Sequence, residues 1–374
     1  MILHLLTDDK FADYVITQFS APEMESEFVL VPSNDMMKLV KRINECKIVC
    51  QSSKEYAELL KRLDQYSAIF FHGMFWGYWQ QPILERVPKS VKVVWYIWGG
   101  EIYARHDLGH SFLAPITKMC ALQHQLKKLQ LKQSPYSWEI PLKLYDKVDY
   151  CLTSIYEEYE FAKQYTGASF EHIWYTYYSM EDTVGALMKE QCHGNNIWIG
   201  NSAAMENNHL DVLWAIYKRR KRLYLKERDV IIPLSYGAQW IRKLVKKAGR
   251  YMLENRMKAL DTFIPRNEYN ELMLSCSTML IGYWEPAAQG NILTALWLGM
   301  RVYLSEKSMS YKFFKRLGAK VFSLESDLDK YEFSELSQDE RKHNREIITK
   351  WYSREHVYQS VRDVVSLLES KKNE

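Results

Sequence analysis

The segment of residues 281–305 constrains the fold more than any other part of this chain. Upstream of its turn, the apolar run Ser277–Tyr283 predicts a short buried strand. After a turn that contains proline and glycine, the residues are apolar on nearly every side, as in a buried helix, and Gly299 fits the end of that helix. The run Arg301–Leu304 then begins another strand. The segment therefore predicts a strand–helix–strand unit of a parallel sheet.

The start of this helix, Gln289-Gly290-Asn291, predicts a binding site for a diphosphate. Glycine lets a ligand approach the backbone, and the first N–H groups of a helix have no partner within it. The positive end of the helix dipole adds to their attraction for an anion. The alternative is an ordinary crossover with a glycine-containing turn and no ligand, because such units occur in every doubly wound domain.

Length and composition indicate a globular, cytoplasmic protein of two domains. A chain of 374 residues, 47% of them hydrophobic, can fill two cores. The formal net charge of +4 is too small to indicate a nucleic-acid partner. The six cysteines lack the spacing of a metal site, which indicates reduced thiols. The first residues run directly into strand-like sequence, and no apolar run could span a bilayer, so we expect neither a secretory leader nor a membrane span.

Polar residues follow the apolar runs at the points where the predicted strands end. Ligands of open α/β sheets bind beyond the carboxyl ends of the strands, so the residues at these ends should line one cleft. In the first half of the chain these residues are Asp8, His72, Gly99, Gly100 and Glu101. In the second half they are Gly200, Asn201 and Ser202, then Ser235 and Tyr236, with His209 near the start of a predicted helix.

The pattern lapses into polar residues around 179–195, which predicts a domain boundary. We expect an N-terminal domain over 1–180 and a C-terminal domain over 190–338. The last segment, 339–374, is too polar for a core helix, and we expect one long helix that braces both domains.

A basic stretch interrupts the first half of the chain. No acidic residue lies between Asp107 and Glu139, whereas Lys118, Lys127, Lys128 and Lys132 do. Apolar residues recur there at approximately helical spacing. A basic amphipathic helix can lie in an anionic membrane surface; the alternative is a solvated helix packed on its own domain.

Several motifs resemble a known family. Two α/β halves with a glycine-led helix in the second are similar to GT-B glycosyltransferases. The motifs 70–75 (FFHGMF), 97–103 (IWGGEIY) and 200–202 (GNS) with His209 resemble the TDP-4-acetamido-4,6-dideoxy-galactose (Fuc4NAc):lipid II transferases of enterobacterial common antigen assembly, glycosyltransferase family 56. The likeness runs from the first strand to the final helix. Two departures are the basic stretch near 118–138 and Glu285-Pro286, which replaces an arginine-containing turn.

The resemblance implies a fold, a reaction and a location. The fold is α/β, with two Rossmann-like domains facing a cleft, the first for the acceptor and the second for the nucleotide-sugar. The reaction moves Fuc4NAc from its dTDP form onto a polyprenyl-diphosphate-linked saccharide, at the cytoplasmic face of the inner membrane. Apart from that donor no cofactor is expected, and no metal. Alternatives are a fucosyl- or other hexosyltransferase of the same fold using GDP- or UDP-sugar, or a non-catalytic glycan- or nucleotide-binding protein.

Such a transfer needs a base for the acceptor hydroxyl and donors for the leaving diphosphate. Glu101 after its Trp-Gly-Gly turn is the first candidate for the base, followed by His72 and Asp8, each with a structural alternative. Thr294 stands where the broad GT-B pattern has a glutamate that holds ribose hydroxyls, and this fits a deoxyribose. The expected donor-side residues are Gly200, Asn201, Ser202, His209, Ser235, Tyr236, Gln289, Gly290, Asn291 and Thr294.

Overall fold

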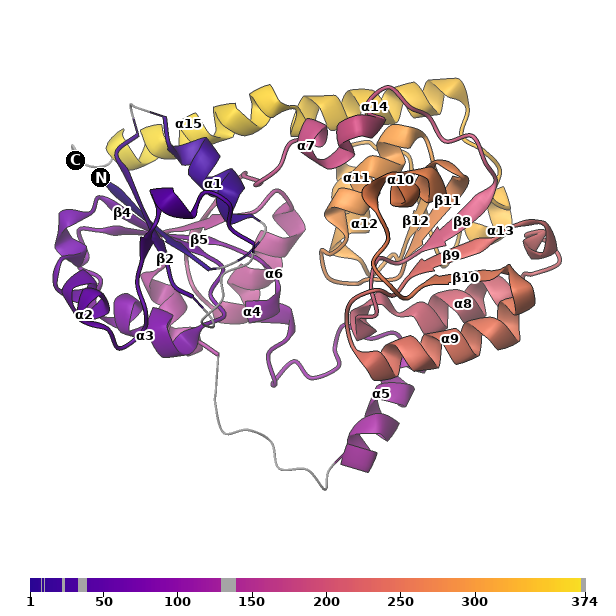
Figure 1. Cartoon of the computed structure of the whole chain (residues 1–374), viewed down its shortest axis with the longest axis horizontal. Coiled ribbons are helices and arrows are strands. Elements are labelled where there is room, and N and C mark those ends of the chain that lie inside the picture. Colours follow the sequence, from indigo (N-terminus) through magenta and orange to yellow (C-terminus); the bar gives the residue numbers. More distant parts are fainter. Residues whose placement is uncertain (8, 10, 22–23, 33–38, 129–138, 371–374) are drawn as a thin grey trace. The chain divides into compact units, whose positions relative to one another are not determined.

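The computed structural model describes residues 1–374 except 8, 10, 22–23, 33–38, 129–138 and 371–374. The chain forms two compact units, and each is a parallel sheet with helices on its two faces (Figure 1). The expected α/β class is therefore confirmed. The first unit contains Met1–Gly109, Pro135–Ser179 and Arg354–Glu374, and the second contains His110–Ser134 and Met180–Ser353.

The first unit has a seven-stranded sheet in the order β3-β2-β1-β4-β5-β6-β7. From β1 the chain moves outward to β2 and β3, and from β4 it moves the other way to β7. Because such crossovers are right-handed, helices before and after this reversal cover opposite faces. The strands are β1 (Ile2–Leu6), β2 (Ser26–Leu30), β3 (Lys47–Ile48), β4 (Ala68–His72), β5 (Lys92–Tyr96), β6 (Tyr150–Leu152) and β7 (Glu171–Ile173). The α-helices are α1 (Ala12–Phe19), α2 (Lys54–Lys61), α3 (Gly77–Arg86), α4 (Gly100–Tyr103), α6 (Tyr156–Thr166) and α15 (Arg354–Ser370).

The second unit has a six-stranded sheet in the order β10-β9-β8-β11-β12-β13, with its reversal between β8 and β11. Its strands are β8 (Asn196–Ile199), β9 (Val230–Pro233), β10 (Met257–Leu260), β11 (Cys276–Ile281), β12 (Arg301–Leu304) and β13 (Val321–Ser323). Its α-helices are α5 (Pro115–Lys128), α7 (Met180–Val184), α8 (His209–Lys218), α9 (Gln239–Leu253), α10 (Arg266–Leu274), α11 (Gln289–Leu298), α12 (Met309–Arg316), α13 (Leu328–Tyr331) and α14 (Gln338–Tyr352).

Helix α11 is buried on all sides, as its sequence predicts. All residues from Ile292 to Leu298 are buried, because α11 packs against α7 and α14 as well as on the sheet. Gly299 ends the helix with φ of +84°. A β-carbon there would lie 2.8 Å from the Arg341 side chain of α14, so glycine also permits this close packing.

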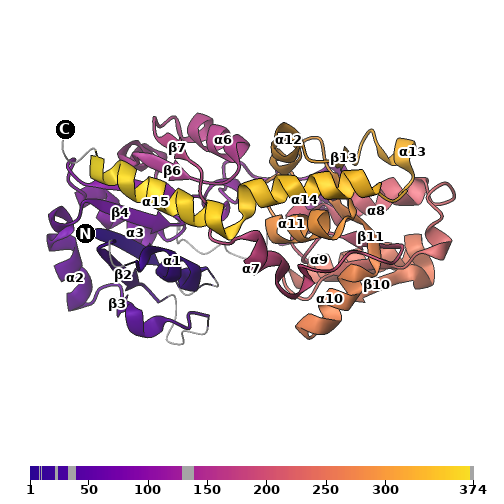
Figure 2. The same ribbon diagram turned by 90° about the horizontal axis from the view of Figure 1, so that it is seen from above.

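The C-terminal segment differs from the single long helix that we expected. It forms two helices, α14 and α15, separated at Ser353, whose backbone is extended (φ −61°, ψ 151°). Helix α14 packs on α11 of the second unit, and α15 packs on α1 of the first (Figure 2). Each unit is thus completed by a different part of this segment.

Residues 110–128 group with the second unit, whereas the expected division placed them in the N-terminal domain. Helix α5 packs against α8, and Asp211 of α8 accepts hydrogen bonds from the amides of Ile116 (2.8 Å) and Thr117 (2.9 Å). One carboxylate of the second unit therefore satisfies two donors at the start of α5.

Candidate functional site

The carboxyl edge of the second sheet carries most of the expected donor-side residues. Loops after β8 and β11 meet at this edge, where the crossovers reverse, and ligands of open α/β sheets bind at such a point. The Asn208 side chain donates to the Gly282 carbonyl at 2.8 Å, and the Asn207 side chain donates to the Tyr283 hydroxyl at 2.8 Å. Two hydrogen bonds therefore fasten the loops together.

Asn201 and Ser202 enter one polar network at this edge, and Gly200 lies directly before them. The side-chain Nδ2 of Asn207 donates to the Ser202 hydroxyl at 3.0 Å, and the Tyr283 hydroxyl donates to the side-chain Oδ1 of Asn201 at 3.1 Å. Gly200 has φ of +67°, and a β-carbon there would lie 2.6 Å from both the Asn207 and the His209 side chains. Glycine is required at this position because both the backbone and the space exclude a side chain.

The loop after β9 is joined to the same network. The Ala203 amide donates to the Tyr236 carbonyl at 2.7 Å, and the Ala238 amide donates to the Ala203 carbonyl at 3.0 Å. The Asn201 side chain donates to the Tyr236 hydroxyl at 3.3 Å, while the Tyr236 side chain stays 59% exposed. Ser235 lies beside it, and its carbonyl accepts from Arg242 at 3.0 Å. The structure thus brings Ser235 and Tyr236 next to Asn201.

The start of α11 has the geometry of an anion site. Ala288 precedes the helix with φ of +58°, and its carbonyl accepts the first helical bond, from the Ile292 amide at 3.0 Å. The amides of Gln289, Gly290 and Asn291 precede that bond, so they point outward along the helix axis. No acidic residue lies in the first turn. The positive end of the α11 dipole is therefore available to an anion.

Side chains of this first turn bind back to their own unit. The side-chain Nε2 of Gln289 donates to the Ser310 hydroxyl at 2.6 Å, and the side-chain Nδ2 of Asn291 donates to the Tyr269 hydroxyl at 3.2 Å. The Thr294 hydroxyl donates to the Gly290 carbonyl at 2.8 Å and is buried. These contacts hold the side chains in place while the backbone N–H groups remain the donors of the site.

His209, the first residue of α8, lies behind this surface rather than on it. Its side chain is 2% exposed, and burial lowers its pKa to about 3, so the ring is neutral. Neither ring nitrogen has a hydrogen-bond partner among the described residues. The His209 ring therefore fits a packing role beneath Gly200.

In the first unit, His72 ends β4 inside the core. Its side chain is 2% exposed, its Nε2 lies 3.1 Å from His4 Nδ1, and its Nδ1 lies 3.0 Å from the Tyr177 hydroxyl. Burial lowers its pKa to about 3. A general base works best with a pKa near the working pH, so these properties fit a structural histidine better than a base. Its hydrogen-bond partners His4 and Tyr177 lie 68 and 105 residues away in the sequence, so the sequence around His72 could not predict them.

Glu101 is also buried, with 1% of its side chain exposed. Its Oε1 accepts from the Trp98 amide at 3.0 Å, from the Trp95 indole at 3.0 Å and from the Met74 amide at 3.5 Å. Burial raises its pKa. The carboxyl group therefore joins the loop after β4 to the loop after β5. Whether Glu101 or His72 acts as a base stays a prediction, and Asp8 lies outside the described residues.

Glu158 is a buried carboxyl group that sequence reasoning missed. It lies on α6, accepts from the Thr153 hydroxyl at 2.5 Å and from the Tyr103 hydroxyl at 3.2 Å, and burial raises its pKa to about 8. Thr153 directly follows β6, so this pair lies at the carboxyl edge of the first sheet. A sequence signal was available, because Thr153 and Glu158 are only five residues apart across the strand-to-helix turn.

One group of potential metal ligands lies in the described part of the first unit. Atoms of His106, Asp107 and Glu139 lie within 4.8 Å of one another. The Arg105 guanidinium lies 3.4 Å from Glu139 and 3.7 Å from Asp107. This cation already supplies positive charge to both carboxylates.

Comparisons with solved structures show the fold. A glycosyltransferase from Rickettsia africae ESF-5 is 11% identical, with a TM-score of 0.64 over 99% of this chain and 97% of the other. HepE from Anabaena, in complex with UDP and glucose, is 10% identical, with a TM-score of 0.62 over 98% and 99%. Sucrose-phosphate synthase from Thermosynechococcus elongatus is 10% identical, with a TM-score of 0.62 over 99% of each chain.

These similarities extend over both units, and the chain has the GT-B glycosyltransferase fold, as expected. No protein-family model matches the sequence, and a comparison with curated proteins gives no significant match. Within the described part of the chain, every helix is too short or too polar to cross a bilayer.

Proposed function

We propose that the protein is a glycosyltransferase that moves a sugar from a nucleoside diphosphate to an acceptor hydroxyl. The observation that carries this proposal is the start of α11. Three backbone amides point outward there, beside the reversal of the second sheet and after a residue with positive φ. A leaving diphosphate develops negative charge, and prearranged amide donors stabilise such charge at small reorganisation cost.

The neighbouring loops would complete the donor site. Asn201, Ser202 and Tyr236 offer polar groups from the loops after β8 and β9, and the network with Asn207 and Tyr283 holds these loops in place. The solved structures of HepE contain UDP with glucose, and UDP-glucose. A nucleotide-sugar is therefore the donor class that the proposed site suits best.

The specific donor that we propose is dTDP-Fuc4NAc, with a polyprenyl-diphosphate-linked saccharide as acceptor. This choice rests on the motifs that resemble the Fuc4NAc:lipid II transferases. Thr294 supports it, since the hydroxyl is already bound to the Gly290 carbonyl and no carboxylate is present there for a ribose. The enzyme would then work at the cytoplasmic face of the inner membrane, where such acceptors are presented.

Three residues remain candidates for the base of this reaction. Glu101 and His72 are buried and hydrogen-bonded, so their replacement is expected to disturb the edge of the first sheet. Glu101 stays the first base to test, because its carboxyl group lies between the loops after β4 and β5. Glu101→Gln should lower kcat by at least about a hundredfold, and the melting temperature of the variant separates loss of a base from loss of the fold. Asp8→Asn tests the third candidate with the same two measurements.

Binding of nucleoside diphosphates tests the donor site directly. Thermal shifts should be measured with dTDP, UDP and GDP, and the nucleotide released from a panel of nucleotide-sugars should then be identified. We expect dTDP to give the largest shift and dTDP to be released. A larger shift with GDP or UDP would support the hexosyltransferase alternative. If all three nucleotides bind but none is released from any nucleotide-sugar, the non-catalytic alternative holds. If none of the three nucleotides shifts the melting temperature, the proposed donor site is contradicted.

A further inference from the structure

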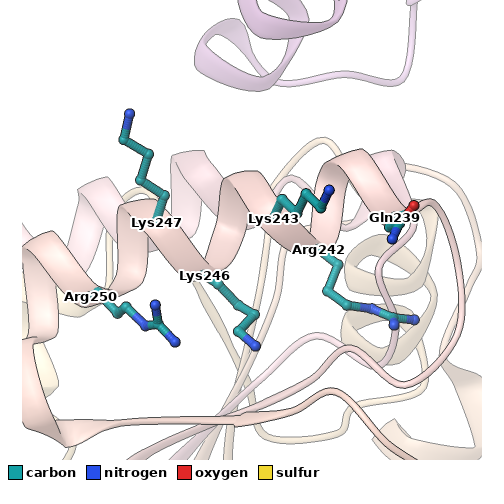
Figure 3. Close-up of a pocket in the computed structure, with 6 residues that line it drawn as sticks. All are labelled: Gln239, Arg242, Lys243, Lys246, Lys247 and Arg250. Carbon is teal, nitrogen blue, oxygen red and sulfur yellow. The ribbon is translucent and has the colours of Figure 1, made fainter.

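Helix α9 carries a basic surface on its solvent side. None of its 15 residues is acidic, whereas five are basic. Lys243, Lys247 and Arg250 are exposed, and the opposite side of the helix packs into the core of the second unit through Ile241 and Val245. A shallow cavity of about 450 Å³ runs along this surface (Figure 3), and its lining residues are Gln239, Arg242, Lys243, Lys246, Lys247 and Arg250.

Most of this charge has no counter-ion within the described part of the protein. Of the five basic residues, only Lys246 forms an ion pair there, with Asp261. Lys243 and Lys247 lie four residues apart, so their like charges repel along the helix by about 0.2–0.5 kcal/mol. Exposed like charges without counter-ions are suited to an anionic partner.

Helix α5 packs against α9 and carries exposed apolar side chains on its far side. The His124 ring stacks on the Trp240 ring of α9, with ring centroids 4.0 Å apart and planes 8° apart. On α5, Met119 is 54% exposed and Leu122 is 45% exposed, and Lys118 is exposed beside them. No acidic residue occurs in α5. Exposed apolar side chains therefore accompany the basic ones on the same unit.

We propose that α9 and α5 together form a docking surface for an anionic phospholipid bilayer. The basic side chains of α9 would bind the headgroups, and Met119 and Leu122 would enter the boundary between headgroups and acyl chains. A nucleic acid would use the same charges, and its preferential binding is one outcome of the test. The inference deepens the proposed function, since a lipid-linked acceptor lies at a bilayer. The membrane contact expected of Lys127, Lys128 and Lys132 stays a separate prediction, because the side chains of those lysines lie outside the described residues.

Flotation of the full-length protein with vesicles tests the surface. Vesicles of phosphatidylcholine with 30% phosphatidylglycerol should bind the protein at low salt, and pure phosphatidylcholine should bind it weakly. The variant K243E/K247E/R250E should bind at least about tenfold less, since each basic group near an anionic surface contributes about fivefold. The matched variant K312E/K315E/K342E makes the same change in charge at exposed positions of α12 and α14, and it should bind like the wild type.

A second variant separates the apolar contribution. M119S/L122S should also lower binding, and the remaining binding should depend more steeply on salt. Wild-type protein that floats equally with both kinds of vesicle, or equal losses in the α9 variant and its matched control, would overturn the proposal. So would preferential binding of a 20-mer of single-stranded DNA with vesicle binding absent. Nucleotide thermal shifts on the same variants report the donor site separately: retained shifts with lost flotation leave the proposed function intact.

Discussion

Asn291→Asp puts a negative charge where the diphosphate is proposed to bind. Asn291 is the third residue of α11, and its side chain reaches the Tyr269 hydroxyl at 3.2 Å. A carboxylate has nearly the same shape, and the tyrosine hydroxyl can donate to it. A negative charge in the first turn also stabilises a helix by about 0.3–1 kcal/mol. The variant should therefore fold with an unchanged or slightly raised Tm.

Its effect on nucleotide binding should be large. Groups on one helical turn lie about 5 Å apart. At an effective dielectric constant of about 20, two negative charges at that distance repel by about 3 kcal/mol, and salt reduces this value. We expect the Kd for the nucleoside diphosphate to rise about tenfold to a hundredfold.

Isothermal titration calorimetry measures that Kd, and thermal denaturation without ligand checks the fold. Gln338→Glu makes the same change in charge at the start of α14 and should leave the Kd unchanged. A Kd for Asn291→Asp within twofold of the wild type, with Tm preserved, would refute the assignment of the diphosphate to α11.

Three further predictions concern stability. Gly200→Ala should lower the free energy of unfolding in urea by about 1–3 kcal/mol, because φ is +67° and the new methyl group meets two side chains at 2.6 Å. Gly167→Ala, with φ of +73° and open space around it, should cost less. Burial raises the pKa of Glu158 to about 8, so the folded protein favours its protonated form and loses stability as the pH rises from about 4.5 to 8. Glu158→Gln should flatten that part of the Tm-against-pH curve, and an unchanged slope would contradict the assignment. Ser337→Ala removes the capping box of α14 and should lower the free energy of unfolding by about 1 kcal/mol; a loss below 0.3 kcal/mol would mean that the cap is not formed in solution.

The sequence predicts those parts of the fold that depend on local patterns. Helix α11 is apolar on all sides because it is buried on all sides, and Gly299 marks its end. Polar residues after apolar runs, such as Asn201 and Tyr236, meet at one edge because parallel strands end there. Periodicity and strand order are enough for these predictions.

Features that depend on distant partners could not be predicted in this way. Glu101 follows a glycine turn, which predicts an exposed side chain. Its carboxyl group is buried instead, because it accepts hydrogen bonds from Met74, Trp95 and Trp98. Helix α5 belongs to the second unit because Asp211, 94 residues beyond Thr117, binds its first turn. The break at Ser353 contains neither proline nor glycine, so the sequence there reads as a continuing helix.

The pairing of α15 with the first unit has a consequence for synthesis. Val361, Val364 and Leu368 belong to the same hydrophobic cluster as Ile2 and Leu6 of the first strand. The core of the first unit can therefore be filled only after residues as far along as Leu368 have been made, more than 350 positions after the strand that they cover. The second unit has no such requirement, because its last residue is Ser353.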